Sequence, residues 1–266
     1  MKSIGIVGCG AIGRSILRAV DEGRLEVPVA GVTSRTEATA REFLAMLRSP
    51  VPFLPRAELI ASADLLIETA GGHVVADLAR DAFAAGKDVM VISIGAILDH
   101  MELFDLAREK GCQLLLPSGA IAGLDAVKGA CSGRVDFVRL TSRKPPRALQ
   151  GAPFVVQNAI SMTDLKEERL LFTGPAREAV KGFPDNLNVS AALSLAGIGP
   201  DKTQVSISAV PGLERNCHDI EVEGEFGLLH VHIENIPSEN PKTGRLTALS
   251  MIRAIGDYVG NVRVGT

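Results

Sequence analysis

The sequence lacks clusters of positive charge and long apolar runs. It has no Lys/Arg-rich tract and a formal net charge of −3, so neither nucleic acid nor an anionic membrane is expected as a partner. No stretch of about 18 apolar residues occurs, as a membrane-spanning helix would need. The apolar run after Lys2 is short and broken by glycines, which argues against a secretory signal. We therefore expect a cytoplasmic protein with a small-molecule partner.

The sequence also lacks closely spaced pairs of cysteines. The four cysteines lie far apart in the sequence and form no C-x-x-C pair, a pattern that favours reduced thiols over a disulfide framework or a zinc knuckle. His230 and His232 could share one face of a strand, but no third ligand is visible nearby and zinc sites need three or four. We expect no metal.

The order of apolar patterns indicates an α/β protein. In the first 120 residues, β-rich runs such as "DLLIET" and "DVMVIS" alternate with helical patterns such as "VVADLARDAFAAG", which is typical of a parallel sheet built from βαβ units. After Gly123 the strands lengthen, as in "VDFVRLTSR" and "DIEVEGEF", and fewer helices separate them. This change predicts a second, α+β domain on a mixed or antiparallel sheet.

The most informative local motif is "IGIVGCGAIGRSI", a strand followed by Gly8-x-Gly10-x-x-Gly13 and a helix. In such a turn the first glycine allows the tight bend, the second lets a pyrophosphate approach the backbone, and the third lets the helix pack close to the strand. Ala11 and Ile12 would open that helix, whose free N–H groups favour phosphate. We therefore predict a doubly wound, Rossmann-type domain that binds a dinucleotide.

The residues after the second predicted strand bear on the choice of cofactor. NAD-selective sites usually carry a carboxylate here, whereas this sequence has Ser34 and Arg35. A guanidinium without a neighbouring acid suits a 2′-phosphate, so we expect NADP to be accepted alongside NAD. After the third strand, Ala70 and Gly71 are small and leave room for the ribose and nicotinamide.

The last predicted helix defines the domain boundaries. "GRLTALSMIRAIGDYVG" is apolar along one face, as expected of a helix that packs on another domain. We predict that residues 1–120 with 243–266 form the dinucleotide-binding domain. Residues 121–242 would then form the domain for substrate, catalysis and oligomerisation, whose open strands favour a homodimer or larger homo-oligomer.

The order of the later motifs resembles one enzyme family. The segments "GCGAIG", "PSGAIAGLDA", "TSRKPP", "FPDNLNVSAALSLAG" and "ENPKTGRLTALS", with a late histidine before an acidic strand, are similar to those of the L-aspartate dehydrogenase family over nearly all 266 residues. The resemblance implies NAD(P)-dependent oxidation of L-aspartate to iminosuccinate. That product hydrolyses to oxaloacetate and ammonia or can feed NAD biosynthesis. The family's histidine falls on His218, and its cofactor contacts fall on Ala122 and Asn188.

Aspartate carries two carboxylates, so its site needs about two cationic or N–H-rich anchors. "TSRKPP" offers Arg143 and Lys144, Arg215 is another cation, and the later "ENPKTGR" offers Lys242 and a helix start at Thr243. The sequence leaves open which of them bind the substrate.

The segment "GLERNCHDIEV" places His218 at the beginning of a strand. Hydride can leave the α-carbon only after the amine loses a proton, and water must later attack the imine. An imidazole with a pKa of about 6.5 can serve either step. We expect His218 to lie at the domain cleft and face the nicotinamide across the substrate, with Asn216 or Asp219 fixing its tautomer. Two alternatives remain: a reductase of related fold that acts on another small dicarboxylate or imine, and a non-catalytic dinucleotide-binding regulator.

Overall fold

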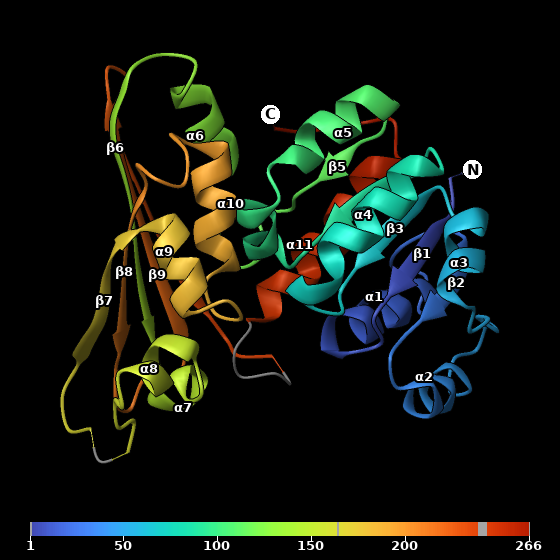
Figure 1. Cartoon of the computed structure of the whole chain (residues 1–266), viewed down its shortest axis with the longest axis horizontal. Coiled ribbons are helices and arrows are strands. Elements are labelled where there is room, and N and C mark those ends of the chain that lie inside the picture. The colour runs from blue at the N-terminus through green and yellow to red at the C-terminus, as the bar shows by residue number, and fades with distance from the viewer. Residues whose placement is uncertain (1, 164, 239–243, 266) are drawn as a thin grey trace. The chain divides into compact units, whose positions relative to one another are not determined.

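The computed structural model describes residues 2–163, 165–238 and 244–265. Contacts within the chain divide it into two compact units. One comprises Met1–Pro117 with Ala248–Arg263, and the other comprises Ser118–Thr247 with Val264–Thr266. Figure 1 shows the helices and strands that build each unit.

The first unit contains a five-stranded sheet of order β2-β1-β3-β4-β5 in which every pairing is parallel. β1 and β3 are buried along their whole length, which explains why their sequences are nearly continuous apolar runs rather than alternating ones. The strands are Ile4–Val7 (β1), Val29–Thr33 (β2), Leu65–Glu68 (β3), Asp88–Val91 (β4) and Leu114–Leu115 (β5).

Helices connect these parallel strands, as parallel pairing requires. They are Ala11–Asp21 (α1), Glu37–Leu44 (α2), Arg56–Ser62 (α3), Val75–Ala84 (α4) and Glu102–Lys110 (α5), with short 3₁₀ turns at Gly72–Val74 (η1) and Ile94–Asp99 (η2).

The C-terminal helix α11 (Arg245–Val259) contributes to the core of this unit. Met251, Ile255 and Tyr258 are buried in the same hydrophobic cluster as residues of β1. The Tyr258 hydroxyl donates a hydrogen bond to Asp88 at 2.7 Å, and burial raises the pKa of this phenol.

The second unit contains a mixed sheet of order β10-β9-β6-β8-β7, in which only the β6–β8 pairing is parallel among the described strands. Its strands are Val135–Lys144 (β6), Arg169–Pro175 (β7), Gln204–Ala209 (β8), Asn216–Gly224 (β9) and Gly227–Asn235 (β10). Its helices are Leu124–Ala130 (α6), Pro146–Leu149 (α7), Pro153–Gln157 (α8), Ala176–Gly182 (α9) and Asn188–Ala196 (α10).

The two faces of the mixed sheet differ sharply. One face, which we call the inner face, packs against α9 and α10 (Figure 1) and carries the fully buried Leu140, Ile207 and Ile220. The opposite, outer face is rich in charged side chains, such as the Arg139–Glu221 ion pair. Because successive strand residues point to opposite faces, this alternation decides which polar residues can meet.

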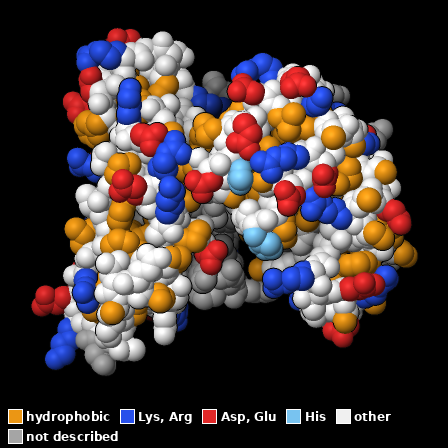
Figure 2. Space-filling model, in the orientation of Figure 1, with side chains coloured by type: hydrophobic (Ala, Val, Ile, Leu, Met, Phe, Trp, Pro, Cys, Tyr) orange, Lys and Arg blue, Asp and Glu red, His pale blue; other side chains and the backbone are white. Residues whose placement is uncertain are grey.

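The α/β fold predicted from the sequence is confirmed, with a parallel doubly wound sheet and a second domain on a mixed sheet. Within the described residues, no helix combines the length and apolar character needed to cross a membrane. Figure 2 shows Lys and Arg side chains interspersed with Asp and Glu on the visible face of both units.

Candidate active site

The glycine-rich turn between β1 and α1 is held between two neighbouring strand ends. Gly8 has a φ of +108°, and a Cβ there would stand 2.7 Å from backbone atoms of Thr69 and Ala70. The Gly8 amide donates to the Thr33 carbonyl at 2.8 Å, and the Thr69 hydroxyl donates to the Gly8 carbonyl at 2.8 Å. Only glycine fits this conformation and this close approach.

Gly10 and Gly13 differ in the space around them. No described atom lies within 4 Å of the position that a Gly10 Cβ would take, so the backbone there faces open space. A Gly13 Cβ, in contrast, would collide with the Gly8 carbonyl oxygen. The first turn of α1, which begins at Ala11 and Ile12, has N–H groups without intrahelical acceptors. These features fit a pyrophosphate at the N-terminus of α1.

The buried carboxylate of Glu68 binds backbone amides in the two loops that follow β3 and β4. Glu68 is fully buried at the end of β3 and accepts hydrogen bonds from the amides of Ala70 and Gly71, both at 2.7 Å. It also accepts a bond from the Ser93 amide, at 3.0 Å. Sequence reasoning overlooked this residue; the signal was an acid that ends the otherwise apolar strand "LLIE".

Ser34 and Arg35 directly follow β2, as the sequence predicts. Ser34 is half-buried, whereas Arg35 is exposed and forms no ion pair with any residue in the described ranges. The Arg35 guanidinium is therefore available for a ligand beside the strand end.

A second group of polar residues lies at one end of the inner face of the mixed sheet. Ser142 and Lys144 end β6, and Asn216 and His218 begin β9; we call these four residues the polar end. None is more than 3 % exposed. Ser142 and His218 are direct partners in the antiparallel β6–β9 pairing, and the same register continued by one pair sets Lys144 opposite Asn216.

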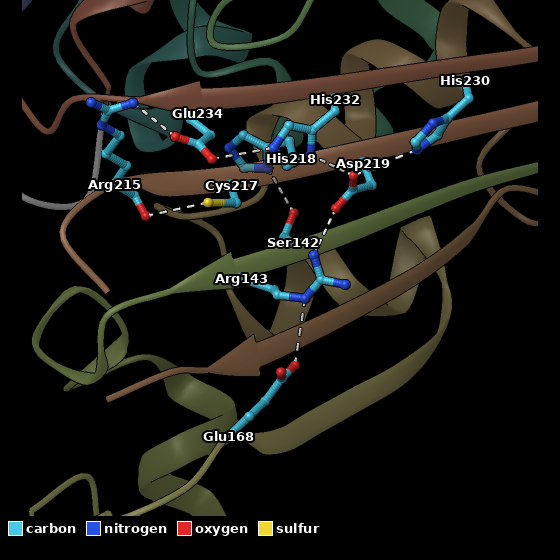
Figure 3. A network of polar contacts seen from close by, with 10 residues as sticks. All are labelled: Ser142, Arg143, Glu168, Arg215, Cys217, His218, Asp219, His230, His232 and Glu234. Atoms are coloured by element: carbon cyan, nitrogen blue, oxygen red, sulfur yellow. Dashed lines mark hydrogen bonds and ion pairs between the residues drawn. The ribbon is translucent and has the colours of Figure 1, made fainter. Parts of the chain in front are cut away.

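His218 is a buried, neutral imidazole. Its Nδ1 is hydrogen-bonded to the Ser142 hydroxyl at 2.9 Å (Figure 3). Burial and the nearby Lys144 charge lower the pKa of His218 to about 3, against an opposing effect of Asp219. Burial likewise lowers the pKa of Lys144 to about 8. Both pKa values are lowered because burial destabilises the charged form of each group.

Ser142, rather than Asn216 or Asp219, is the hydrogen-bond partner of His218. Asp219 follows His218 on the strand and so points to the outer face, where its carboxylate contacts His232 at 2.6 Å and Arg143 at 2.8 Å (Figure 3). Burial raises the pKa of the Asp219 carboxyl, but its contacts with His232 and Arg143 outweigh burial and lower that pKa overall. Asp219 and Glu234 raise the pKa of His232. Sequence reasoning missed Ser142 because 76 positions along the chain separate it from His218.

Side chains alternate between the two faces along β6, so two predicted substrate anchors, Arg143 and Lys144, point to opposite faces of the sheet. Lys144 is buried in the polar end, but Arg143 is on the outer face, paired with Asp219 and, at 3.7 Å, with Glu168. Arg215 is also engaged, in an ion pair with Glu234 at 2.8 Å. Lys144 is therefore the one predicted cation that the described structure brings together with His218.

The remaining predicted residues are placed as follows. Ala122 is exposed just before Gly123, the residue that precedes α6. Asn188 is half-buried and begins α10. Lys242 and Thr243 lie outside the described residues. In the part of the chain that the structure describes, no three His, Cys, Asp or Glu residues are grouped as a metal site would require.

Comparison with known proteins identifies two family models. Residues 8–117 match the NAD binding domain of homoserine dehydrogenase, and residues 125–258 match the C-terminal domain of aspartate dehydrogenase. The first match covers the glycine-rich turn, and the second covers the whole polar end.

Full-length relatives agree with these matches. The chain is 44 % identical to an L-aspartate dehydrogenase of Methanosarcina acetivorans, with all of both chains covered. It is also 44 % identical to L-aspartate dehydrogenase 3 of Bordetella bronchiseptica, over 99 % of this chain and 97 % of that one. The crystal structure of aspartate dehydrogenase from Thermotoga maritima has the same fold, with a TM-score of 0.74 at 23 % identity over all of both chains. The predicted family is thus confirmed, and the chain belongs to the aspartate dehydrogenase family.

Proposed function

We propose that the protein is a cytoplasmic enzyme that oxidises L-aspartate with a nicotinamide dinucleotide. The product would be iminosuccinate, which hydrolyses to oxaloacetate and ammonia or feeds NAD biosynthesis. The observation that carries this proposal is the buried Ser142–His218 pair beside Lys144, in a chain similar over its whole length to proteins named L-aspartate dehydrogenase. This arrangement combines a proton-transfer group, His218, with a cation, Lys144, that can bind a dicarboxylate.

We assign cofactor binding to residues 1–120 with 243–266 and the substrate chemistry to residues 121–242. The turn formed by Gly8, Gly10, Ala11, Ile12 and Gly13 would hold the pyrophosphate, because its backbone faces open space at Gly10. Ala70 and Gly71, held in place by Glu68, leave room for the ribose and nicotinamide. Ala122 and Asn188, although they belong to residues 121–242, are our further candidates for cofactor contact. When bound, the cofactor accepts the hydride from the substrate α-carbon.

Both NAD and NADP would serve as cofactor. Ser34 and the exposed Arg35 stand where a carboxylate would exclude a 2′-phosphate. The exposed guanidinium can pair with that phosphate, and the Ser34 hydroxyl can hydrogen-bond either cofactor.

His218 would move the proton in this reaction. Ser142 engages Nδ1, so Nε2 is the nitrogen left for the substrate. If the Ser142 hydroxyl accepts from Nδ1–H, Nε2 carries the free lone pair of a base. This base can deprotonate the substrate amine or activate the water that attacks the imine.

Lys144 complements the charge of the substrate. Aspartate with its amine protonated carries a net charge of −1, and this charge would raise the lowered pKa values of both Lys144 and His218. Binding would thus keep Lys144 protonated and make His218 a stronger base than it is in the free protein. Lys242 and Thr243 stay candidates for the second carboxylate, whereas Arg143, which lies on the outer face and pairs with Asp219, does not.

The test is aspartate-dependent reduction of NAD and of NADP by the purified protein at alkaline pH, followed at the absorbance band of the reduced nicotinamide. Turnover of L-aspartate supports the proposal. Turnover of another small dicarboxylate or imine, with none of aspartate, would instead indicate a related reductase. Cofactor binding without any turnover would indicate a non-catalytic regulator.

We also propose that the protein forms a homodimer or larger homo-oligomer through the outer face of the mixed sheet. This face carries the exposed Leu228, and helices α9 and α10 pack on the other side. Most soluble oligomers are symmetric homo-oligomers, and Leu228 gives this otherwise charged face an apolar contact for a second copy. Light scattering should give at least twice the monomer mass, and a monomeric mass would rule the proposal out.

A further inference from the structure

The polar end contains a side chain whose polar atoms have no partner. Asn216 is 1 % exposed, and both its Nδ2 and its Oδ1 are buried without a hydrogen bond to any described residue. An amide removed from water in this way is destabilising, because it has lost its hydrogen bonds to water and gained none. Buried polar groups in native proteins nearly always have a partner, so Asn216 needs an explanation.

Other buried asparagines of the same unit are engaged. Nδ2 of Asn235 donates to the Ala120 carbonyl at 2.7 Å, and Nδ2 of Asn186 donates to the Ala148 carbonyl at 2.8 Å. Each of these amides joins its residue to a segment far away in the sequence. Asn235 is moreover the direct β10 partner of Asn216, so the two residues differ in hydrogen bonding rather than in position along the sheet.

Asn216 lies beside His218 and Lys144, the two residues that carry the proposed chemistry. Asn216 and His218 are two residues apart on β9, so their side chains point to the same face of the sheet. The continued register places Lys144 across from Asn216 on β6. An unpartnered donor and acceptor thus lie beside a buried cation and a buried imidazole.

The chemistry of the amide matches one class of ligand. Nδ2 donates hydrogen bonds and Oδ1 accepts them, and a 2-amino acid presents a carboxylate acceptor and an amine donor on one carbon. We propose that Asn216 is a substrate-binding residue, with Nδ2 donating to a carboxylate and Oδ1 accepting from the amine of a 2-amino dicarboxylate. This inference rests on the proposed function. It explains why an apolar residue does not occupy the position, since the amide acquires its partners when substrate binds.

The decisive variant is Asn216→Leu, which keeps the branched arrangement of heavy atoms but has no polar atoms. Without ligand, its melting temperature should equal or exceed that of the wild type, because two unsatisfied atoms are removed. Its KM for L-aspartate should rise at least about tenfold, the equivalent of one lost hydrogen bond to a charged group. The turnover number should change less, as expected when a contact made in both the ground state and the transition state is lost.

Two further variants complete the experiment. Asn235→Leu is the matched control and should lower the melting temperature, because it leaves the Ala120 carbonyl without its donor. Asn216→Asp should raise KM at least as much as Asn216→Leu, since its charge repels both substrate carboxylates. Fluorescence titration should give the same cofactor affinity for both Asn216 variants as for the wild type.

The outcomes separate this inference from the proposed function. An Asn216→Leu protein that loses melting temperature as Asn235→Leu does would indicate a structural role and overturn the inference. An unchanged KM for aspartate would overturn it as well, while wild-type turnover of aspartate would leave the proposed function standing. A wild-type protein inactive with aspartate would overturn both.

Discussion

The glycine-rich turn and the polar end are built in opposite ways. The turn uses the backbone of consecutive residues, and its glycines matter for the space that they leave. The polar end uses side chains from two strands, and its central hydrogen bond joins Ser142 to His218, 76 residues apart. A backbone site suits the phosphates common to all dinucleotides, whereas a side-chain site can be specific for one substrate. The difference predicts distinct consequences when each site is mutated.

The largest effect is expected from the side-chain site. His218→Ala should lower the turnover number about 100- to 10,000-fold, the usual loss when a general acid or base is removed. Steady-state kinetics with aspartate measures it, and cofactor affinity should stay near that of the wild type. His230→Ala is the control, because His230 is exposed on the outer face, and it should change little. If His218→Ala kept more than half of the turnover, His218 would be a structural residue.

The next-largest effect is expected at Arg35, the exposed residue that follows β2. Arg35→Ala should weaken NADP binding by about 1.5 to 3 kcal/mol, the range for a hydrogen bond to a charged group. The KM for NADP would then rise about tenfold or more, while NAD, which lacks the 2′-phosphate, serves as the internal control. Equal effects on both cofactors would mean that Arg35 does not contact that phosphate.

Two glycines of the turn should differ although they lie three residues apart. Gly13→Ala places a methyl group against the Gly8 carbonyl and should lower the free energy of unfolding by about 1 to 3 kcal/mol, as overpacking usually does. Gly10→Ala meets no described atom, so its unfolding free energy should stay close to that of the wild type. Denaturant titrations of both variants measure this, and equal losses would contradict the division of roles.

The pH dependence of stability should also distinguish the two sites. The pKa of His218 is about 3 in the folded protein, below its ordinary value of 6.5. Between these values the unfolded chain binds a proton that the folded protein excludes, so the free energy of unfolding falls as pH falls from 6.5 toward 3. His218→Ala removes this term and should lose less stability than the wild type between pH 7 and pH 4.5, by on the order of 2 kcal/mol. Parallel losses in the two proteins would contradict the lowered pKa.

The fold could be predicted from the sequence because its signals are local. The alternation of β-rich runs and helical patterns, and the spacing of Gly8, Gly10 and Gly13, need no knowledge of distant contacts. Glu68 was missed since its role depends on how two loops return to one strand end.

The candidate site in the second unit was harder to predict for the same reason. The pairing of Ser142 with His218 depends on the register between β6 and β9, which no short segment reveals. Arg143 and Lys144 are neighbours in the sequence, yet strand alternation sends them to opposite faces, with Arg143 paired to Asp219. His218 itself was predicted from its resemblance to the family's histidine together with the chemistry of imidazole.

The central claim is that one site binds the cofactor through backbone while the other moves the proton. It is tested most directly by a double-mutant cycle of Gly10→Ala and His218→Ala, with cofactor dissociation constant and aspartate turnover measured for all four proteins. The Gly10 change should weaken cofactor binding about tenfold, as a methyl group intrudes on the pyrophosphate, and the His218 change should not. His218→Ala should account for nearly all of the lost turnover at saturating cofactor, and the two effects on kcat/KM should multiply. If His218→Ala weakened cofactor binding as much as Gly10→Ala and kept more than half of the turnover, the account would be contradicted.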